Sequence, residues 1–173
     1  MVPSHSEAEK RYKALRESAI SAIQTGLGQR AGYEHIRLST IDNAALIASK
    51  KWLDSTNRRV GWDWFEGYSS FAFRFPKRFE LAVWEKGVLM SLSLGQPTRH
   101  GSALRLDFIE ANPDEVASVK LFPISVIAMY SYAEMIGASE LRLFKPINDT
   151  VRQYYEENGF VYVKKGNYLY MRM

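Results

Sequence analysis

The chain begins with an amphipathic pattern. Across residues 6–27, apolar side chains recur at spacings of three and four, and Tyr12, Leu15, Ile23 and Leu27 define the stripe. Such a stripe predicts one amphipathic helix. Gly26 and Gly28 are expected to end it in a left-handed turn. The stripe requires a partner surface, either in the same chain or across a homodimer.

Strand-like patterns dominate the middle of the chain. A short strand is predicted over residues 34–40, and a helix is predicted to begin at Asp42 or Asn43. Residues 79–97 form two apolar runs separated by Glu85, Lys86 and Gly87, which indicates a hairpin. Residues 103–111 alternate between apolar and polar side chains. We therefore expect a meander of three antiparallel strands.

The last third of the chain returns to helices. Residues 122–136 are apolar on nearly every side, which predicts a deeply buried helix that ends at Gly137. A strand over residues 141–144, a helix over 149–158 and one or two strands within 161–170 complete the pattern. These elements predict an α/β (α+β) fold with a mixed, mostly antiparallel sheet and helices on both faces.

Aromatic side chains are concentrated in residues 60–78, where no clear period is visible. The segment contains Trp62, Trp64, Phe65, Tyr68, Phe71, Phe73 and Phe75. These rings cover the edge of the core, or they form an aromatic wall around a ligand. Trp62 and Trp64 are the candidate ligand-binding residues of this segment.

Composition narrows the chemistry. The 173 residues are 46% hydrophobic, enough for one core, and contain no cysteine, which excludes disulfides, thiolate metal sites and cysteine nucleophiles. No metal site is expected, because the three histidines are far apart in the sequence. No apolar run reaches the roughly 20 residues of a membrane span, so we expect a soluble, cytoplasmic protein without a membrane partner.

The net charge of +4 arises from residues 1–60. A basic region of this kind is a solvated helix face, or it attracts an anionic partner. Lys50, Lys51, Arg58 and Arg59, together with exposed tryptophans, would be the residues of a nucleic-acid site. A nucleic-acid partner is the less favoured of these two interpretations.

The C-terminal pattern carries a family resemblance. Asn148, Val151, Tyr155, Gly159 and Phe160 stand at the spacing of a motif of the GNAT superfamily of N-acetyltransferases, which residues 33–173 resemble in element order. Residues 1–32 are then an added N-terminal amphipathic helix and linker, and 33–173 a GNAT-like acyltransferase domain. The sequence departs from the family at the pyrophosphate loop, because its two glycines would fall at Lys120 and Phe122. Pro123 also removes a backbone donor.

The resemblance implies a set of site residues. Tyr155 would be the general acid that protonates the departing thiolate, and Glu110 the base, with Asp107 as the other carboxylate of the third meander strand. Strict alternation would place Glu110 on one face with Leu106 and Phe108, and Asp107 on the other with Arg105 and Ile109. A carboxylate on the apolar face of a strand is expected to have a raised pKa, which suits a base. The residues implied for coenzyme A are Ile109, Ala111, Lys120 and Asn148.

The implied function is acyl-CoA-dependent N-acyltransfer from acetyl-CoA, the co-substrate, to a small-molecule or peptide amine. Trp62 and Trp64 lie on the side where this fold admits its acceptor, which favours an amine with an aromatic or apolar stem. A second hypothesis is a GNAT-like binding module without catalysis, supported by the missing glycines. The third is the nucleic-acid-binding protein described above.

Overall fold

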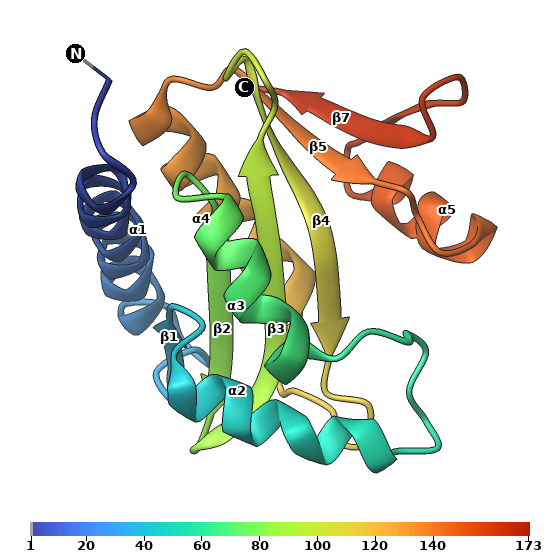
Figure 1. The fold of residues 1–173 in the computed structure, drawn as a ribbon. Helices are drawn as coiled ribbons and strands as arrows, with labels where there is room; N and C mark the ends of the chain where they lie inside the picture. The colour runs from blue at the N-terminus through green and yellow to red at the C-terminus, as the bar shows by residue number, and fades with distance from the viewer. Residues whose placement is uncertain (1) are drawn as a thin grey trace.

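The computed structural model describes residues 2–173 and contains a seven-stranded sheet in the order β1-β2-β3-β4-β5-β7-β6 (Figure 1). The strands are β1 (Ile36–Ser39), β2 (Phe79–Glu85), β3 (Val88–Pro97), β4 (Ala103–Ala111), β5 (Glu140–Phe144), β6 (Val161–Val163) and β7 (Tyr168–Arg172). The helices are α1 (His5–Gly28), α2 (Asn43–Ser49), the 3-10 helix η1 (Lys50–Asp54), α3 (Trp64–Arg74), α4 (Leu121–Ile136) and α5 (Asp149–Glu157). Among the strands of residues 2–173, only β4 and β5 pair in parallel, which confirms the predicted fold class.

Two apolar layers hold the sheet between its helices. On one face, Leu81 and Val83 of β2 pack in a core with Met129 of α4. On the opposite face, Ala82 and Trp84 of β2 pack in a second core with α2, η1 and α3. Successive residues of β2 point to opposite faces, so one strand serves both cores. None of the helices described in residues 2–173 is long and apolar enough to cross a membrane.

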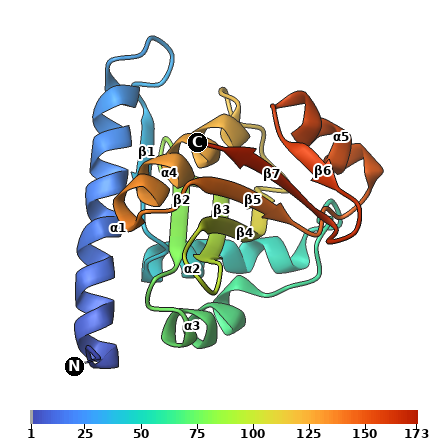
Figure 2. The ribbon, with the colours of Figure 1, turned by 90° about the horizontal axis from the view of Figure 1, so that it is seen from above.

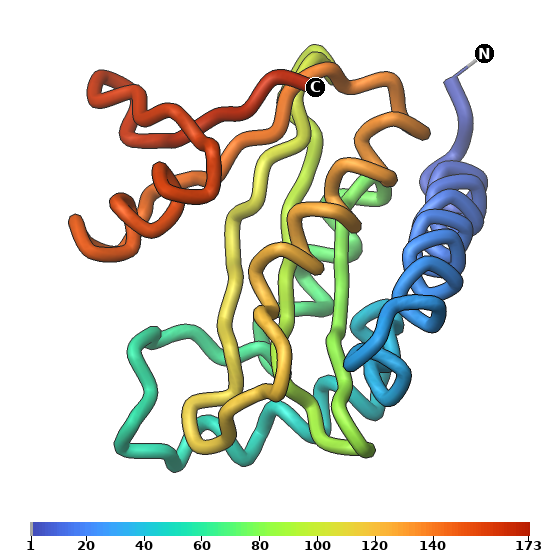
Figure 3. The backbone as a smooth tube through the Cα atoms, turned by 180° about the vertical axis from the view of Figure 1, so that it is seen from behind, coloured from blue at the N-terminus to red at the C-terminus, as the bar shows by residue number. Residues whose placement is uncertain are grey.

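Helix α1 packs in the same chain rather than requiring a second copy. It lies along β1, β2 and α4 (Figures 2 and 3), with Ala19 and Leu27 buried and Leu15 and Ile23 packed against the core. The helix and its end at Gly28 were predicted correctly, but the left-handed turn at that end was not. Its last residue is Gly28, the capping Gln29 is right-handed, and the positive φ of 88° falls at Gly32.

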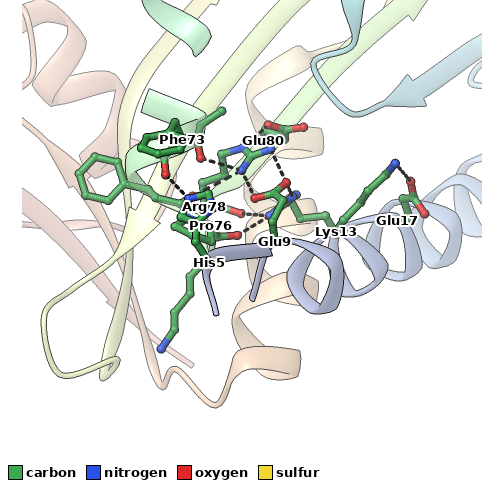
Figure 4. A network of polar contacts seen from close by, with 12 residues as sticks. His5, Glu9, Lys13, Glu17, Phe73, Pro76, Arg78 and Glu80 are labelled. Atoms are coloured by element: carbon green, nitrogen blue, oxygen red, sulfur yellow. Dashed lines mark hydrogen bonds and ion pairs between the residues drawn. The ribbon is translucent and has the colours of Figure 1, made fainter. Parts of the chain in front are cut away.

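A buried ionic network fastens α1 to the start of β2 (Figure 4). Arg78 pairs with Glu9 of α1 at 2.8 Å and with Glu80 at 2.7 Å, while the buried Arg16 donates to the Pro76 carbonyl. Burial raises the pKa of Glu9, but Arg78 and Arg16 more than offset this, so its pKa lies below the usual range. Alternating charges thereby allow two arginines to be buried at one junction.

Helix α3 is the main element that sequence patterns missed. Residues 64–74 form an amphipathic helix, because Trp64, Phe65, Tyr68 and Phe71 recur at spacings of three and four and pack in one apolar cluster. A start signal was present: the Asp63 side chain caps the helix by accepting the Glu66 backbone N–H. Helix α4 matches its prediction closely, except that Ile127 and Tyr130 are exposed.

Strand β4 contains a bulge at Asp107. Leu94 of β3 faces Phe108 and Gly95 faces Leu106, so Asp107 has no partner across the ladder. A side chain at position 95 is excluded here, since a Cβ atom would lie 2.1 Å from the Arg105 carbonyl oxygen. The bulge breaks the predicted alternation. Leu106 belongs to the α4 core and Phe108 to the α3 core, so Glu110 shares a face with Phe108 but not with Leu106.

Candidate functional site

The candidate site is a groove that opens where β4 separates from β5. The parallel ladder between them runs from Ala103 opposite Glu140 to Leu106 opposite Leu143 and then ends (Figure 1). Beyond Leu106, the edge of β4 that faced β5 borders a cavity of about 1340 Å³. Backbone groups on that edge have no strand partner and are available to a ligand.

Residues from several strands, helices and loops line this groove. Ile109 and Ala111 come from β4 and Tyr155 from α5, as the sequence predicted, and Trp62 lies on the side of α3. Two of the residues predicted for coenzyme A lie outside the lining. Lys120 is exposed at the first turn of α4, and Asn148 caps α5 by accepting the Val151 backbone N–H at 2.9 Å. Asn148 thus orients the helix that presents Tyr155.

Tyr155 presents a protonated hydroxyl to the groove. Its ring stacks on Phe122 of α4, with centroids 4.9 Å apart and 27° between the planes. Burial, with a smaller effect of Tyr154, raises the pKa of Tyr155 to about 12. The hydroxyl therefore keeps its proton at neutral pH, as a general acid requires.

Glu110 is buried and held by three donors. Arg58 forms a forked ion pair with it, Nε to Oε2 at 2.9 Å and Nη2 to Oε1 at 3.0 Å, and Trp64 donates its indole N–H to Oε1 at 2.8 Å. The hydrogen bond to Glu110 raises the pKa of the Arg58 guanidinium. The sequence predicted an apolar environment for Glu110, and this prediction was wrong, because Arg58 and Trp64 surround its carboxylate with donors. Only Oε2 retains room for another donor.

Asp107 is the other carboxylate that lines the groove. The bulge directs it toward Arg105, whose Nε lies 2.8 Å from Oδ1, and toward Gln96, whose amide nitrogen lies 3.2 Å from Oδ2. Burial raises the pKa of Asp107, although Arg105 and Gln96 oppose this shift. A carboxylate with a raised pKa beside a cavity has the properties of a catalytic base.

The first turn of α4 closes one end of the groove. Phe122 is buried there against Tyr154, Tyr155 and Phe160. Within residues 2–173 no side chain caps this helix, so the backbone N–H groups of Leu121 and Phe122 have no capping partner, and Pro123 has no N–H to offer. The turn thus has fewer free donors and more bulk than a glycine loop would have.

Sequence reasoning overlooked two arginines at this site. Arg58, which had been assigned to a possible nucleic-acid surface, points inward to Glu110. Arg74 at the end of α3 lines the groove, and only knowledge of that helix could have placed it there. Three of the four tryptophans are also buried, so they do not form the exposed stacking surface of the nucleic-acid hypothesis.

Comparisons with known proteins define the fold. No protein-family model matches the chain, and no curated protein matches its sequence. Among solved structures, a GNAT-family acetyltransferase from Staphylococcus aureus Mu50 superposes with a TM-score of 0.63 at 8% identity, over 79% of this chain and 98% of that one. Ard1 from Thermoplasma volcanium gives 0.57 at 10% identity, over 80% and 98%.

A third similar structure is the ribosomal-protein-S18-alanine N-acetyltransferase from Escherichia coli, with a TM-score of 0.53 at 15% identity over 79% of this chain and 91% of that one. At such low identities the likeness concerns the fold. The chain has the GNAT fold, and the structures that share it include N-acetyltransferases.

Proposed function

We propose that this protein is an acyl-CoA-dependent N-acyltransferase that transfers an acetyl group from acetyl-CoA to an amine. One observation carries the proposal: the unpaired edge of β4, the buried carboxylate of Asp107 and the protonated hydroxyl of Tyr155 border a single groove. A solved structure with this fold, yncA from Salmonella typhimurium, is described with acetyl-CoA as its cofactor. These features supply a thioester site, a base and an acid.

The donor would lie along the unpaired edge of β4. Backbone groups of residues 109–111 would hold the pantetheine arm, since β-strand edges hydrogen-bond extended amides well. The diphosphate would lie at the first turn of α4, where Leu121 and Phe122 offer backbone N–H groups and Lys120 adds a positive charge. Because of Pro123 and the Phe122 ring, the diphosphate would have fewer backbone donors and less room here than in a glycine loop.

The chemical step needs two proton transfers. The amine nitrogen forms a bond to the acyl carbon while its proton passes to a carboxylate, and the C–S bond breaks while the Tyr155 hydroxyl protonates the sulfur. We favour Asp107 as the proton acceptor, because burial raises its pKa, whereas Glu110 accepts three hydrogen bonds from Arg58 and Trp64. Glu110, which the sequence analysis assigned as the base, remains a prediction. The thiol-release assay described below tests it.

One observation favours a second function, a binding module without catalysis. Phe122 occupies the place of a family glycine and packs directly on Tyr155, which reduces the room for a diphosphate. The two functions differ in turnover, and thiol release distinguishes them. The chain has no cysteine, so a thiol-reactive dye would report only coenzyme A released from acetyl-CoA. Release that depends on an added amine supports the enzyme, and its absence across a broad amine panel supports the module.

A further inference from the structure

A smaller pocket adjoins the groove beneath α3. Its volume is about 230 Å³, and Trp62, Trp64, Phe71, Phe75, Leu94 and Phe108 form its apolar walls. Phe108 is one of these walls and makes edge-to-face contacts to Trp62 at 5.1 Å and to Phe71 at 6.0 Å between centroids. An apolar cavity of about 150 Å³ accepts benzene. The pocket therefore has room for one aromatic side chain.

Two donors without protein partners stand at the boundary between pocket and groove. Trp62 and Arg74 line both spaces. The Trp62 indole Nε1 is buried and has no hydrogen-bond partner, a state that costs free energy unless a ligand supplies an acceptor. The Arg74 guanidinium, within residues 2–173, forms no ion pair, and its central carbon lies 5.4 Å from the centre of the Phe75 ring. A carboxylate would satisfy both donors.

The bulge in β4 links this pocket to the reactive groups. Asp107 and Phe108 are consecutive, and the bulge turns both toward the α3 side, where Asp107 meets Gln96 and Phe108 meets the aromatic cluster. A ligand ring packed on Phe108 therefore lies one residue away from the carboxylate. The single acidic side chain that lines the pocket, Asp63, is engaged in capping α3.

From this arrangement we infer that the acceptor is an aromatic α-amino acid with a free carboxylate, an inference that rests on the proposed acyl transfer. The ring occupies the pocket on Phe108, and the carboxylate binds Arg74 and the Trp62 indole N–H. The amino group then points toward Asp107 in the groove. Bound as the neutral amine, it loses one proton to that carboxylate as the new N–C bond forms; the C–S bond breaks, and the Tyr155 hydroxyl gives its proton to the sulfur, so that coenzyme A leaves as the thiol.

Binding of three probes, each measured by isothermal titration without an acyl donor, tests the pocket. L-Phenylalanine carries the ring and the carboxylate, L-alanine lacks the ring, and 2-phenylethylamine lacks the carboxylate. We expect L-phenylalanine to bind most tightly of the three. Arg74→Gln should weaken L-phenylalanine by about 10-fold to 100-fold, the effect of a charged hydrogen bond, and leave 2-phenylethylamine unchanged.

The control variant is Arg99→Gln, which removes an exposed arginine that lines neither space. It should bind all three probes as the wild type does. Equal affinity of Arg74→Gln and wild type for L-phenylalanine would overturn the inference, as would binding of L-alanine as tightly as L-phenylalanine.

The test of the aromatic acceptor and the test of acyl transfer can succeed or fail independently of each other. If acetyl-CoA is consumed with another amine while L-phenylalanine fails to bind, the acyl transfer stands and the aromatic acceptor is wrong. If L-phenylalanine binds in an Arg74-dependent manner while acetyl-CoA fails to bind, the pocket stands and the acyl transfer is wrong.

Discussion

Phe122 of α4 and Tyr155 of α5 stack with their ring centroids 4.9 Å apart. The contact joins the first turn of one helix, where the GNAT pattern has a glycine, to the residue that the same pattern makes the general acid. A bulky ring at the end of the groove that is proposed to hold the diphosphate therefore also packs against Tyr155. Phe122 therefore has a packing role that a glycine could not fill, which is a structural reason for the absence of a glycine at this position.

Phe122→Ala should lower the free energy of unfolding by about 3 kcal/mol, because the removed ring is buried and the cavity cannot close fully. Urea denaturation gives this value. Phe122→Leu is the matched control, which keeps most of the volume and should cost clearly less. Equal stability of the alanine variant and the wild type would show that the stack contributes nothing.

Tyr155→Phe should reduce acyl transfer by about 100-fold to 10,000-fold while the melting temperature stays near that of the wild type. The ring keeps its contact with Phe122, and no hydrogen bond to the Tyr155 hydroxyl is found within residues 2–173. Thiol release and thermal unfolding measure the two effects. A variant with wild-type turnover would remove Tyr155 from the mechanism.

The pH profile should show an acid limb that belongs to Asp107. Its pKa is raised by burial, so kcat/KM should fall as the pH decreases through that raised pKa and the carboxylate becomes protonated. Asp107→Asn should remove most of the activity and, with it, this limb. Because the pKa of Tyr155 is about 12, no loss from Tyr155 ionisation is expected below about pH 10. An unaltered acid limb in Asp107→Asn would return the assignment to Glu110.

The Arg58–Glu110 pair should behave as a structural unit. Glu110→Gln leaves the Arg58 guanidinium, whose side chain is 9% exposed, without its counter-charge, and we expect a loss of about 3 kcal/mol or more in unfolding free energy. The double variant Arg58→Met with Glu110→Gln should recover part of that loss. Additive losses in chemical denaturation would show that the two side chains are not coupled.

Local signals in the sequence predicted most of the architecture. The stripe of residues 6–27, the Lys86–Gly87 hairpin and the apolar run ending at Gly137 each have a period or a turn residue that specifies its structure. Gly87 and Gly137 have positive φ angles of 79°. The sequence did not predict helix α3, because Phe73, which is 72% exposed, adds an apolar residue to the polar face and obscures the helical period of the other rings.

The site was less predictable, since its geometry depends on one extra residue in β4. Strict alternation grouped Glu110 with Leu106, whereas the bulge at Asp107 moves Leu106 to the opposite face. Bulges depend on the contact between two strands, here the close approach at Gly95, and not on the pattern of either strand alone. The ion pair of Glu110 with Arg58 could not be predicted from a local pattern either, because the two residues are 52 positions apart in the sequence.

Isothermal titration of the full chain with acetyl-CoA tests the central claim, that an acyl thioester binds along the free edge of β4. The account predicts saturable one-to-one binding that Ala111→Trp abolishes, because Ala111 lines the groove and is exposed enough to accept a larger side chain without loss of stability. The control Ala31→Trp, at an exposed position outside the groove, should bind as the wild type does. Absence of saturable binding to the wild type, or equal affinity in Ala111→Trp, would contradict the account.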